Sequence, residues 1–306
     1  MSLYFSQREY LSRKRATLRE MHARDLDGLL MFRQESMYYL TGMQTFGYCF
    51  FQCVYLGADG RTVLLTRLPD LLAAEFSTVV DECREWRNLP GANPALDLRE
   101  VLEENDCRGK RLGIELDAYG LTAYNYRRVD AALNDFCRLE DASDLVTRLR
   151  VVKSSKELQY CRRAGMLADA ALTEAHQLAV PGAHESDILA AMQGAVFKGD
   201  GDYSGNEFII NSGPRAKLGR YLSERRALDR NDQLTIEWAG VYRFYHAAMM
   251  RTVLTGKPSR RQVSIHAAAV DAHEASVEKL RAGNTFGDVF EAYAKSARRR
   301  GMKHLH

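Results

Sequence analysis

The amino-terminal half of the chain alternates between helical spacings of apolar residues and short runs that are apolar throughout. A capping-box signature, Ser6 with Glu9, precedes a helical pattern, and the apolar run 29–32 after it has the length of a buried strand. The dipeptide Asp59-Gly60 predicts a hairpin turn before a strand at 62–66. The same patterns predict further elements downstream: helices at 70–76, 98–104 and 122–133, and a strand at 111–116. This alternation favours an α/β domain with a partly parallel sheet.

The pattern changes between residues 141 and 153, after which helices and strands are grouped rather than alternating. A second capping box, Ser154 with Glu157, opens a long alanine-rich helix. The elements predicted beyond it are helices at 186–197, 261–280 and 286–299, with strands at 207–211 and within 233–254. Grouped helices and strands favour an α+β domain, so we predict two domains, 1–145 and 146–306.

Composition places the chain among globular proteins, with 46% apolar and 27% charged residues in a total of 306. The 43 basic and 40 acidic residues give a net charge of +3, which provides no strong field for nucleic acid or an anionic membrane, so neither is expected as a partner. The six cysteines show no C-x-x-C pair or zinc spacing, and the amino terminus is charged too early for a secretory signal. We therefore expect reduced thiols and a cytoplasmic protein.

Two segments imitate functional motifs without completing them. The uncharged stretch 36–58 has the length of a membrane span, but glycines and glutamines interrupt it. The loop 200–205 has the alternating oxygen ligands of the first half of a calcium-binding loop, yet its twelfth position is Asn211 rather than a glutamate. The glycines of this loop also lack the spacing of a dinucleotide-binding turn. We predict neither a membrane span nor a calcium or dinucleotide site.

The segment 234–254 contains the most informative acidic residue. In an alternating strand Glu237 shares a face with Thr235 and Ala239, while the apolar residues between them share the other face. A carboxylate in such an apolar stretch must find a partner, shift its pKa or point into a cleft, because uncompensated burial is costly. Glu237 is therefore either a core glutamate paired with a nearby arginine, Arg243 or Arg251, or a catalytic carboxylate.

Four segments match, in order, the motifs of one enzyme superfamily: SMYYLTG at 36–42, DASDLVTRLRVVKSSKELQYCRRAG at 141–165, FIINSGP at 208–214 and EWAGVYRFYHAAMMRTVLTGKPS at 237–259. They resemble the pita-bread superfamily of creatinase, prolidase, aminopeptidase P and methionine aminopeptidase. The resemblance covers nearly the whole chain. It implies a creatinase-type α/β amino-terminal domain, an α+β pita-bread catalytic domain and a homodimer.

The resemblance also implies a metal site in the metallopeptidase members, and that site is altered here. Two aspartates of the strand pair fall on Glu237 and Ala248, and a histidine of the preceding loop falls on Arg220. An alanine supplies no ligand and an arginine adds positive charge, so divalent metal ions should bind weakly. We therefore expect no metal cofactor, which argues against peptidase chemistry.

The segment around Glu237 is most similar to the metal-independent branch that contains creatinase and ectoine hydrolase. This resemblance implies hydrolysis of a C–N bond in a small cationic solute. Glu237 would attack the electrophilic carbon or activate water while His246 moves the proton. If Glu237 lies opposite Ala248 in an antiparallel pair, His246 faces Ala239 and is a diagonal neighbour of Glu237, with backbones ~7–8 Å apart. A structural glutamate–histidine hydrogen bond is the alternative, and both named enzymes carry a histidine at or near Arg220 that this chain lacks.

Substrate contacts are predicted for five residues: Arg220, Arg251, Tyr203, Tyr245 and Phe46. The two guanidinium groups match a substrate carboxylate, although Arg251 has the alternative of pairing with Glu237. The two tyrosines fall in segments that match the hydrolase branch. Phe46 belongs to an aromatic pattern with Tyr48 and Phe50, which would either stack on a small cation across the domain or dimer boundary or pack in the core.

The pita-bread domain of the superfamily normally continues through another block of strands, so the resemblance predicts a truncated domain in a chain that stops at His306. Two other functions stay open at this point: a proline-directed metallopeptidase and a non-catalytic binding module. Bound metal and chelator sensitivity distinguish the metallopeptidase. The absence of any thermal shift with amidines, guanidino acids and proline dipeptides would favour the binding module.

Overall fold

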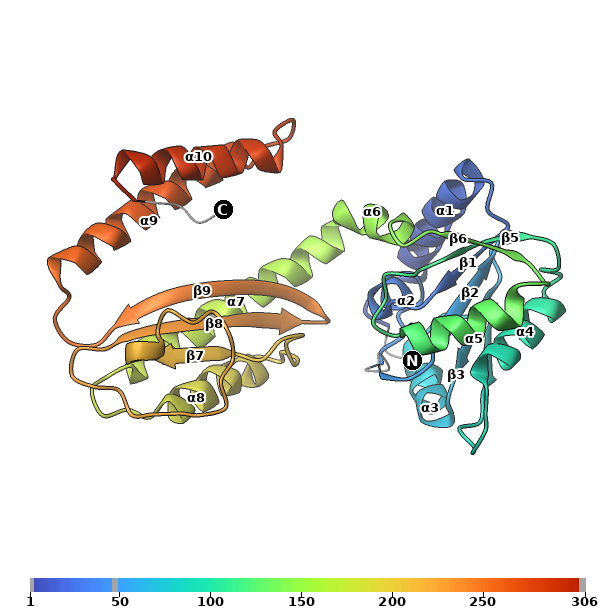
Figure 1. The fold of residues 1–306 in the computed structure, drawn as a ribbon, viewed down its shortest axis with the longest axis horizontal. Coiled ribbons are helices and arrows are strands. Elements are labelled where there is room, and N and C mark those ends of the chain that lie inside the picture. Colours follow the sequence, from blue (N-terminus) through green and yellow to red (C-terminus); the bar gives the residue numbers. More distant parts are fainter. Residues whose placement is uncertain (1–2, 46–48, 303–306) are drawn as a thin grey trace. The chain divides into compact units, whose positions relative to one another are not determined.

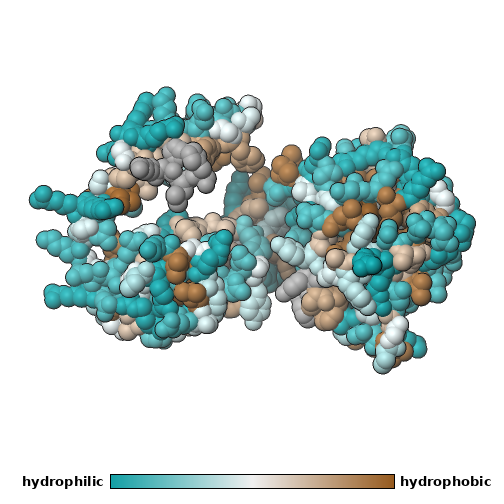
Figure 2. All heavy atoms as spheres, viewed as in Figure 1, coloured by the Kyte–Doolittle hydropathy of each residue, from teal (hydrophilic) through white to brown (hydrophobic). Residues whose placement is uncertain are grey.

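The computed structural model describes residues 3–45 and 49–302 (Figure 1). The chain divides into two compact units, Met1–Lys156 and Glu157–His306. Hydrophilic residues cover most of the visible surface of each unit, while the apolar residues supply the cores (Figure 2). No helix in the described part of the chain is both long enough and apolar enough to cross a membrane.

The first unit ends later than the predicted boundary between residues 145 and 146. Helix α6 (Leu145–Val151) packs against α1 (Gln7–Ala23) and α2 (Gln34–Thr41), and its first two residues are buried in their shared core. The change in sequence pattern therefore marks the end of the sheet of the first unit. The unit itself continues through the packing of one more helix.

The first unit is built on a six-stranded sheet with the order β4-β3-β2-β1-β5-β6. Its strands are β1 (Gly28–Met31), β2 (Cys53–Gly57), β3 (Thr62–Thr66), β4 (Glu82–Glu85), β5 (Arg111–Ile114) and β6 (Arg138–Asp141). Its remaining helices are α3 (Leu68–Ser77), α4 (Pro94–Glu104) and α5 (Ala123–Leu133). Strand β1 pairs antiparallel with β2 and parallel with β5, which confirms the predicted α/β domain with a partly parallel sheet.

Burial on both faces of this sheet explains its continuously apolar strands. Leu29 and Met31 of the β1 segment join one core cluster with α1, α2 and α6, whereas Leu30 and Phe32 join a second cluster with α4 and α5. A strand covered on both faces shows no polar alternation. The uncharged stretch 36–58 is likewise explained, because its described part supplies most of α2 and all of β2.

A buried carboxylate joins β5 to the start of α2. Glu115 is fully buried and accepts hydrogen bonds from the backbone N–H groups of Phe32 (2.9 Å) and Arg33 (2.8 Å) and from the Ser36 hydroxyl (2.5 Å). It thereby satisfies donors at the amino end of α2, where the N-cap Arg33 makes no side-chain capping bond. Burial raises the pKa of Glu115 to about 7, although the three hydrogen bonds oppose this shift.

The second unit has a three-stranded antiparallel sheet with the order β7-β8-β9. Its elements are α7 (Ser155–Leu178), which starts at the end of the first unit, α8 (Glu185–Lys198), β7 (Ile209–Ser212), β8 (Gln233–Tyr242), β9 (Tyr245–Leu254), α9 (Arg260–Lys279) and α10 (Phe286–Arg299). Helices α7 and α8 cover one face of the sheet, and α9 packs on α10 (Figure 1). The Trp238 indole donates to the carbonyl of Ala168 on α7 at 3.0 Å, which fixes the apolar face of β8 against the helices. The predicted α+β class is confirmed.

Candidate functional site

The face of the sheet that does not pack on α7 and α8 carries Glu237. Across the ladder Glu237 pairs with Ile209 of β7 and with Met250 of β9. The side chain is half-buried, and its carboxylate has no hydrogen bond or ion pair within residues 3–45 and 49–302. The pairing with Arg243 or Arg251 that a core glutamate would need is not formed. The carboxylate is therefore a free acceptor on the central strand.

The register of β8 and β9 differs from the predicted one. Ala248 lies opposite Ala239 and is a diagonal neighbour of Glu237, while His246 lies opposite Val241. His246 is thus displaced from Glu237 by four residues along the strand, which corresponds to ~13 Å at the usual rise of a strand. The two side chains share a face but are too far apart to pass a proton directly. The predicted close contact between Glu237 and His246 is therefore wrong.

The position of the hairpin turn causes this difference. The predicted register requires Tyr242 and Arg243 to form the turn, whereas the structure places the turn at Arg243 and Phe244. Both turn residues have positive φ, 51° and 64°, the geometry of a type I′ turn that usually selects asparagine or glycine. Because neither residue type is present, the sequence contains no local marker for the turn, and a shift of one residue there moves every cross-strand pair by two.

A loop from the end of α8 holds this turn in place. The Arg243 backbone N–H donates to Asp202 Oδ2 at 2.9 Å, and its guanidinium lies 3.1 Å from Asp200. The carboxylates that suggested half of a calcium loop therefore stabilise the hairpin. His246 joins the same assembly, because its Nε2 accepts from the Gly205 N–H at 3.0 Å and its Nδ1 donates to the Phe244 carbonyl at 2.9 Å. These partners require the neutral Nδ1–H tautomer and support a structural role for His246.

A second loop lies over the same face on the other side of Glu237. Thr235, which shares the face of Glu237, donates from its hydroxyl to the Ala216 carbonyl at 2.5 Å. Asn211 of β7 donates to the carbonyls of Leu218 and Arg220, both at 2.9 Å. Asn211 lies opposite Thr235 and is therefore a diagonal neighbour of Glu237. Its hydrogen bond holds the Arg220 backbone near that position. Its exposed guanidinium donates to the adjacent Gly219 carbonyl at 2.6 Å.

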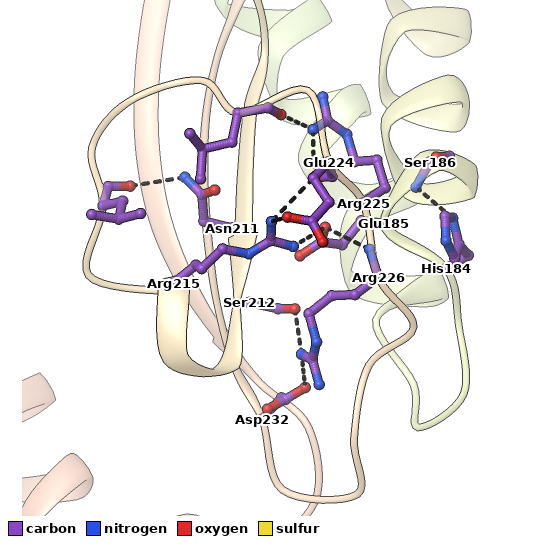
Figure 3. Close-up of polar contacts among 12 residues, drawn as sticks. His184, Glu185, Ser186, Asn211, Ser212, Arg215, Glu224, Arg225, Arg226 and Asp232 are labelled. Atoms are coloured by element: carbon purple, nitrogen blue, oxygen red, sulfur yellow. Dashed lines mark hydrogen bonds and ion pairs between the residues drawn. The ribbon is translucent and has the colours of Figure 1, made fainter.

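Buried and half-buried charges fix this second loop at its two ends (Figure 3). Arg226 donates to the Ser212 hydroxyl at 2.7 Å and to Asp232 at 2.5 Å. Glu185, at the start of α8 and fully buried, accepts from the Arg226 N–H at 3.1 Å and lies 3.6 Å from the Arg215 guanidinium. The sequence analysis missed this network. The sequence does show a carboxylate, Glu185, at the start of a predicted helix, and consecutive arginines at 225 and 226. Their pairing could not be predicted, because the partners are far apart in the chain.

Two of the other predicted substrate contacts, Arg251 and Tyr245, lie on the opposite face of the sheet. Arg251 pairs with Ile236 and is therefore on the face opposite to Glu237. Tyr245 is on that opposite face too, where its hydroxyl donates to Glu157 of α7 at 2.8 Å. Phe46 lies outside the residues that the structure describes, as does its predicted neighbour Tyr48.

Tyr203 lines a pocket of about 560 Å³ between α8 and the loop 202–208, and Tyr221 and Arg225 also line it. Its side chain is 83% exposed, and its ring meets that of Phe197 edge-on at 4.9 Å between centroids. Glu237 is not among the residues that line this pocket. Tyr203 and Glu237 therefore do not belong to the same pocket.

The donor set around Glu237 does not fit a two-metal centre. Ala248, at the diagonal position, offers a methyl group in place of a ligand, and the nearby loop presents the cationic Arg220. In the part of the chain that the structure describes, no three histidine, cysteine, aspartate or glutamate side chains lie close enough together to hold a metal ion. Glu237 is thus available as an isolated carboxylate.

Each of the two units matches the model of a known protein family. The model of the Creatinase/Prolidase N-terminal domain matches residues 13–152, and that of Metallopeptidase family M24 matches residues 159–306. The chain joins a creatinase/prolidase N-terminal domain to an M24 domain. Its M24 domain has the pita-bread fold, as the resemblance predicted, and members of this family are hydrolases.

Proteins that are similar to the chain over both units carry different enzyme names. A hydrolase/peptidase of uncharacterised activity from Sinorhizobium fredii is 27% identical over 98% of this chain and 79% of its own length. Ectoine hydrolase from Halomonas elongata is 27% identical over 94% of this chain and 76% of its own length. The crystal structure of a prolidase from Thermococcus sibiricus superposes with a TM-score of 0.83 at 19% identity, covering 95% of this chain and 78% of that one. The last likeness concerns the fold alone.

Proposed function

We propose that the M24 domain hydrolyses a C–N bond in a small cationic solute, of the ectoine or creatine type, without a metal ion. The observation that supports this most strongly is the state of Glu237. Its carboxylate is half-buried on the central strand and unpartnered within the described residues, and Ala248 stands where a second carboxylate would be needed for metal binding. A half-buried acceptor without a partner loses part of its hydration and gains no hydrogen bond in return, so a chemical role accounts for its presence better than a structural one.

A single carboxylate is sufficient for this reaction. Glu237 removes a proton from water as the water oxygen bonds to an amidine or guanidinium carbon. The resulting carboxylic acid then returns the proton to the nitrogen as the C–N bond breaks, so atoms and charge balance without another reagent. Direct attack of the carboxylate on the carbon is the other route open to Glu237. His246 takes no part in either route, because it is ~13 Å along the strand and engaged with Gly205.

Arg220 is the residue that we propose to hold a substrate carboxylate. Its backbone is attached to Asn211 beside Glu237, and its exposed guanidinium is engaged with its own neighbouring carbonyl rather than with an acidic side chain. A planar guanidinium in this position suits bidentate recognition of a carboxylate. The name of the Halomonas elongata relative supports an ectoine-like substrate. We further propose a cytoplasmic homodimer that has neither nucleic acid nor a membrane as partner.

The proposal is tested by the turnover of ectoine, creatine and proline dipeptides, followed by mass spectrometry of the products. Glu237→Gln should lower kcat/KM by at least ~100-fold, the lower range for loss of a general base. Glu274→Gln, an exposed glutamate of α9, is the matched control and should retain full activity. Chelation should leave the wild-type rate unchanged. Full turnover by Glu237→Gln would refute the assignment.

A proline-directed metallopeptidase is the second candidate, because the matching family is named for metallopeptidases. It predicts cleavage of proline dipeptides, metal in stoichiometric amounts by elemental analysis, and loss of activity on chelation. Failure to turn over any of the three substrate classes by a well-folded chain would instead favour a non-catalytic binding module.

A further inference from the structure

The pocket that Tyr203 lines is a preformed cavity outside the Glu237 site. It lies between α8 and the loop 202–208, and its volume of about 560 Å³ falls in the range of small-molecule sites. The loop that forms its wall is fixed by three backbone N–H groups. Gly201 donates to the Val196 carbonyl at 2.9 Å, Asp202 donates to the Val241 carbonyl at 3.0 Å, and Gly205 donates to His246 Nε2 at 3.0 Å. A wall fixed in this way needs little ordering when a ligand binds.

Aromatic rings are exposed around this pocket. Phe197, Tyr203 and Tyr221 all line it, and all three side chains are exposed to solvent. Phe197 and Tyr203 meet edge to face, and both residues line the pocket. Tyr221 already carries the Arg225 guanidinium at 4.9 Å from its ring centroid, so one ring of the set is engaged with a cation within the chain itself. Exposed aromatic faces of this kind attract cations.

The charges that line the pocket also favour a cation. Glu207 is exposed and has no hydrogen bond or ion pair among the residues that the structure describes. Asp202 uses Oδ2 to accept from the Arg243 N–H. Arg225, the positively charged member of the lining, donates to the carbonyls of Leu222 and Glu224. Two carboxylates against one guanidinium leave one negative charge in excess.

We propose that this pocket binds a small organic cation whose positive group lies against the rings of Phe197 and Tyr203, with Glu207 as its counter-charge. The site is separate from Glu237 and independent of the proposed hydrolysis. Binding can therefore be measured whether or not the chain turns over a substrate.

Choline and its uncharged isostere 3,3-dimethylbutan-1-ol test the proposal, because they differ in the positive charge and hardly in shape. Each is titrated into the full chain, and the backbone amide resonances are followed by NMR. Choline should shift resonances of α8, the loop 202–208 and residues 221–225, with a Kd at least ~threefold lower than that of the alcohol. Equal affinities, the absence of saturable shifts, or shifts centred elsewhere would each overturn the proposal.

Variants then assign the contacts. Tyr203→Leu removes the ring and Glu207→Gln removes the charge, and each should raise the Kd for choline ~threefold while leaving the alcohol unaffected. Tyr203→Phe retains the ring and should bind as the wild type does. Tyr119→Leu, which changes an exposed tyrosine of the first unit, is the control for altered surface polarity. All three positions are exposed, so folding should be preserved, and unchanged choline binding in both Tyr203→Leu and Glu207→Gln would refute the assignment.

Discussion

Replacing Glu115 by glutamine should abolish a pH-dependent loss of stability in the first unit. The buried carboxyl group keeps its proton until about pH 7 in the folded chain, while its ordinary pKa is 4.5. Glutamine is neutral throughout this range and of nearly the same shape. Its carbonyl oxygen can still accept from the N–H groups of Phe32 and Arg33, and its amide can donate to the Ser36 hydroxyl.

The direction and size of the effect follow from proton linkage. Below pH 4.5 the carboxyl group is protonated in both states, and its contribution to stability is fully present. Between pH 4.5 and about 7 the folded state binds more protons than the unfolded state, so the free energy of unfolding falls as the pH rises. At ~1.4 kcal/mol per unit of pKa shift, the total loss is ~3 kcal/mol, and the curve is flat above about pH 7.

Urea unfolding across this pH range measures the loss. Trp86 lies in the first unit and Trp238 in the second, and they are the two tryptophans of the chain, so a Trp238→Phe background makes fluorescence report on the first unit. Subtracting the Glu115→Gln curve from that of the parent removes groups that titrate in both proteins. The difference should change by ~3 kcal/mol. A constant difference, or one that changes with the opposite sign, would refute the reasoning.

Three further substitutions, the first with a matched control, test the packing of the second unit. Gly240→Ala places a methyl group 2.0 Å from the backbone oxygen of Ala164 and should lower the free energy of unfolding in urea by ~3 kcal/mol or more. In the control Gly194→Ala the new methyl group meets no atom within 4 Å, so the free energy of unfolding should change by at most ~1 kcal/mol. His246→Ala removes the acceptor of the Gly205 N–H, so exchange of that amide should accelerate at least ~fivefold; an unchanged rate would contradict the role given to the ring. Arg226→Gln leaves Asp232 without its ion pair and should lower stability by ~2 kcal/mol, a loss that thermal unfolding would show.

Local patterns predicted most of the helices and the long strands of the described residues, but they missed the short helices α2 and α6 and two short strands. The Ser6 hydroxyl accepts from the Glu9 N–H at 3.2 Å, as the capping signature required. Strands β4 and β6 were missed because they form the two edges of the six-stranded sheet. Each is four residues long, polar and partly exposed, so neither produces an apolar run. An edge strand is defined by its neighbour in space more than by its own composition.

The candidate site was predicted in part. The sequence identified Glu237 as an unusual carboxylate and placed Ala248 and His246 on its face, and the strand alternation in the structure agrees. The register was wrong because a turn without glycine or asparagine is positioned by Asp200 and Asp202, which come from a distant loop. The role of Glu115 was missed for the same reason, since its partners are contributed by another segment.

Hydrophobic spacing and residue types along the chain were enough to establish the α/β and α+β units and the face to which Glu237 belongs. These are local properties, because the spacing of apolar residues within a helix or strand determines which of its faces is buried. Packing alone decided that the Glu237 carboxylate has no partner among the described residues, that His246 is bonded to Gly205, and that Arg251 and Tyr245 lie on the opposite face. Each outcome depends on where loops return to the sheet, and that depends on contacts between residues far apart in the chain.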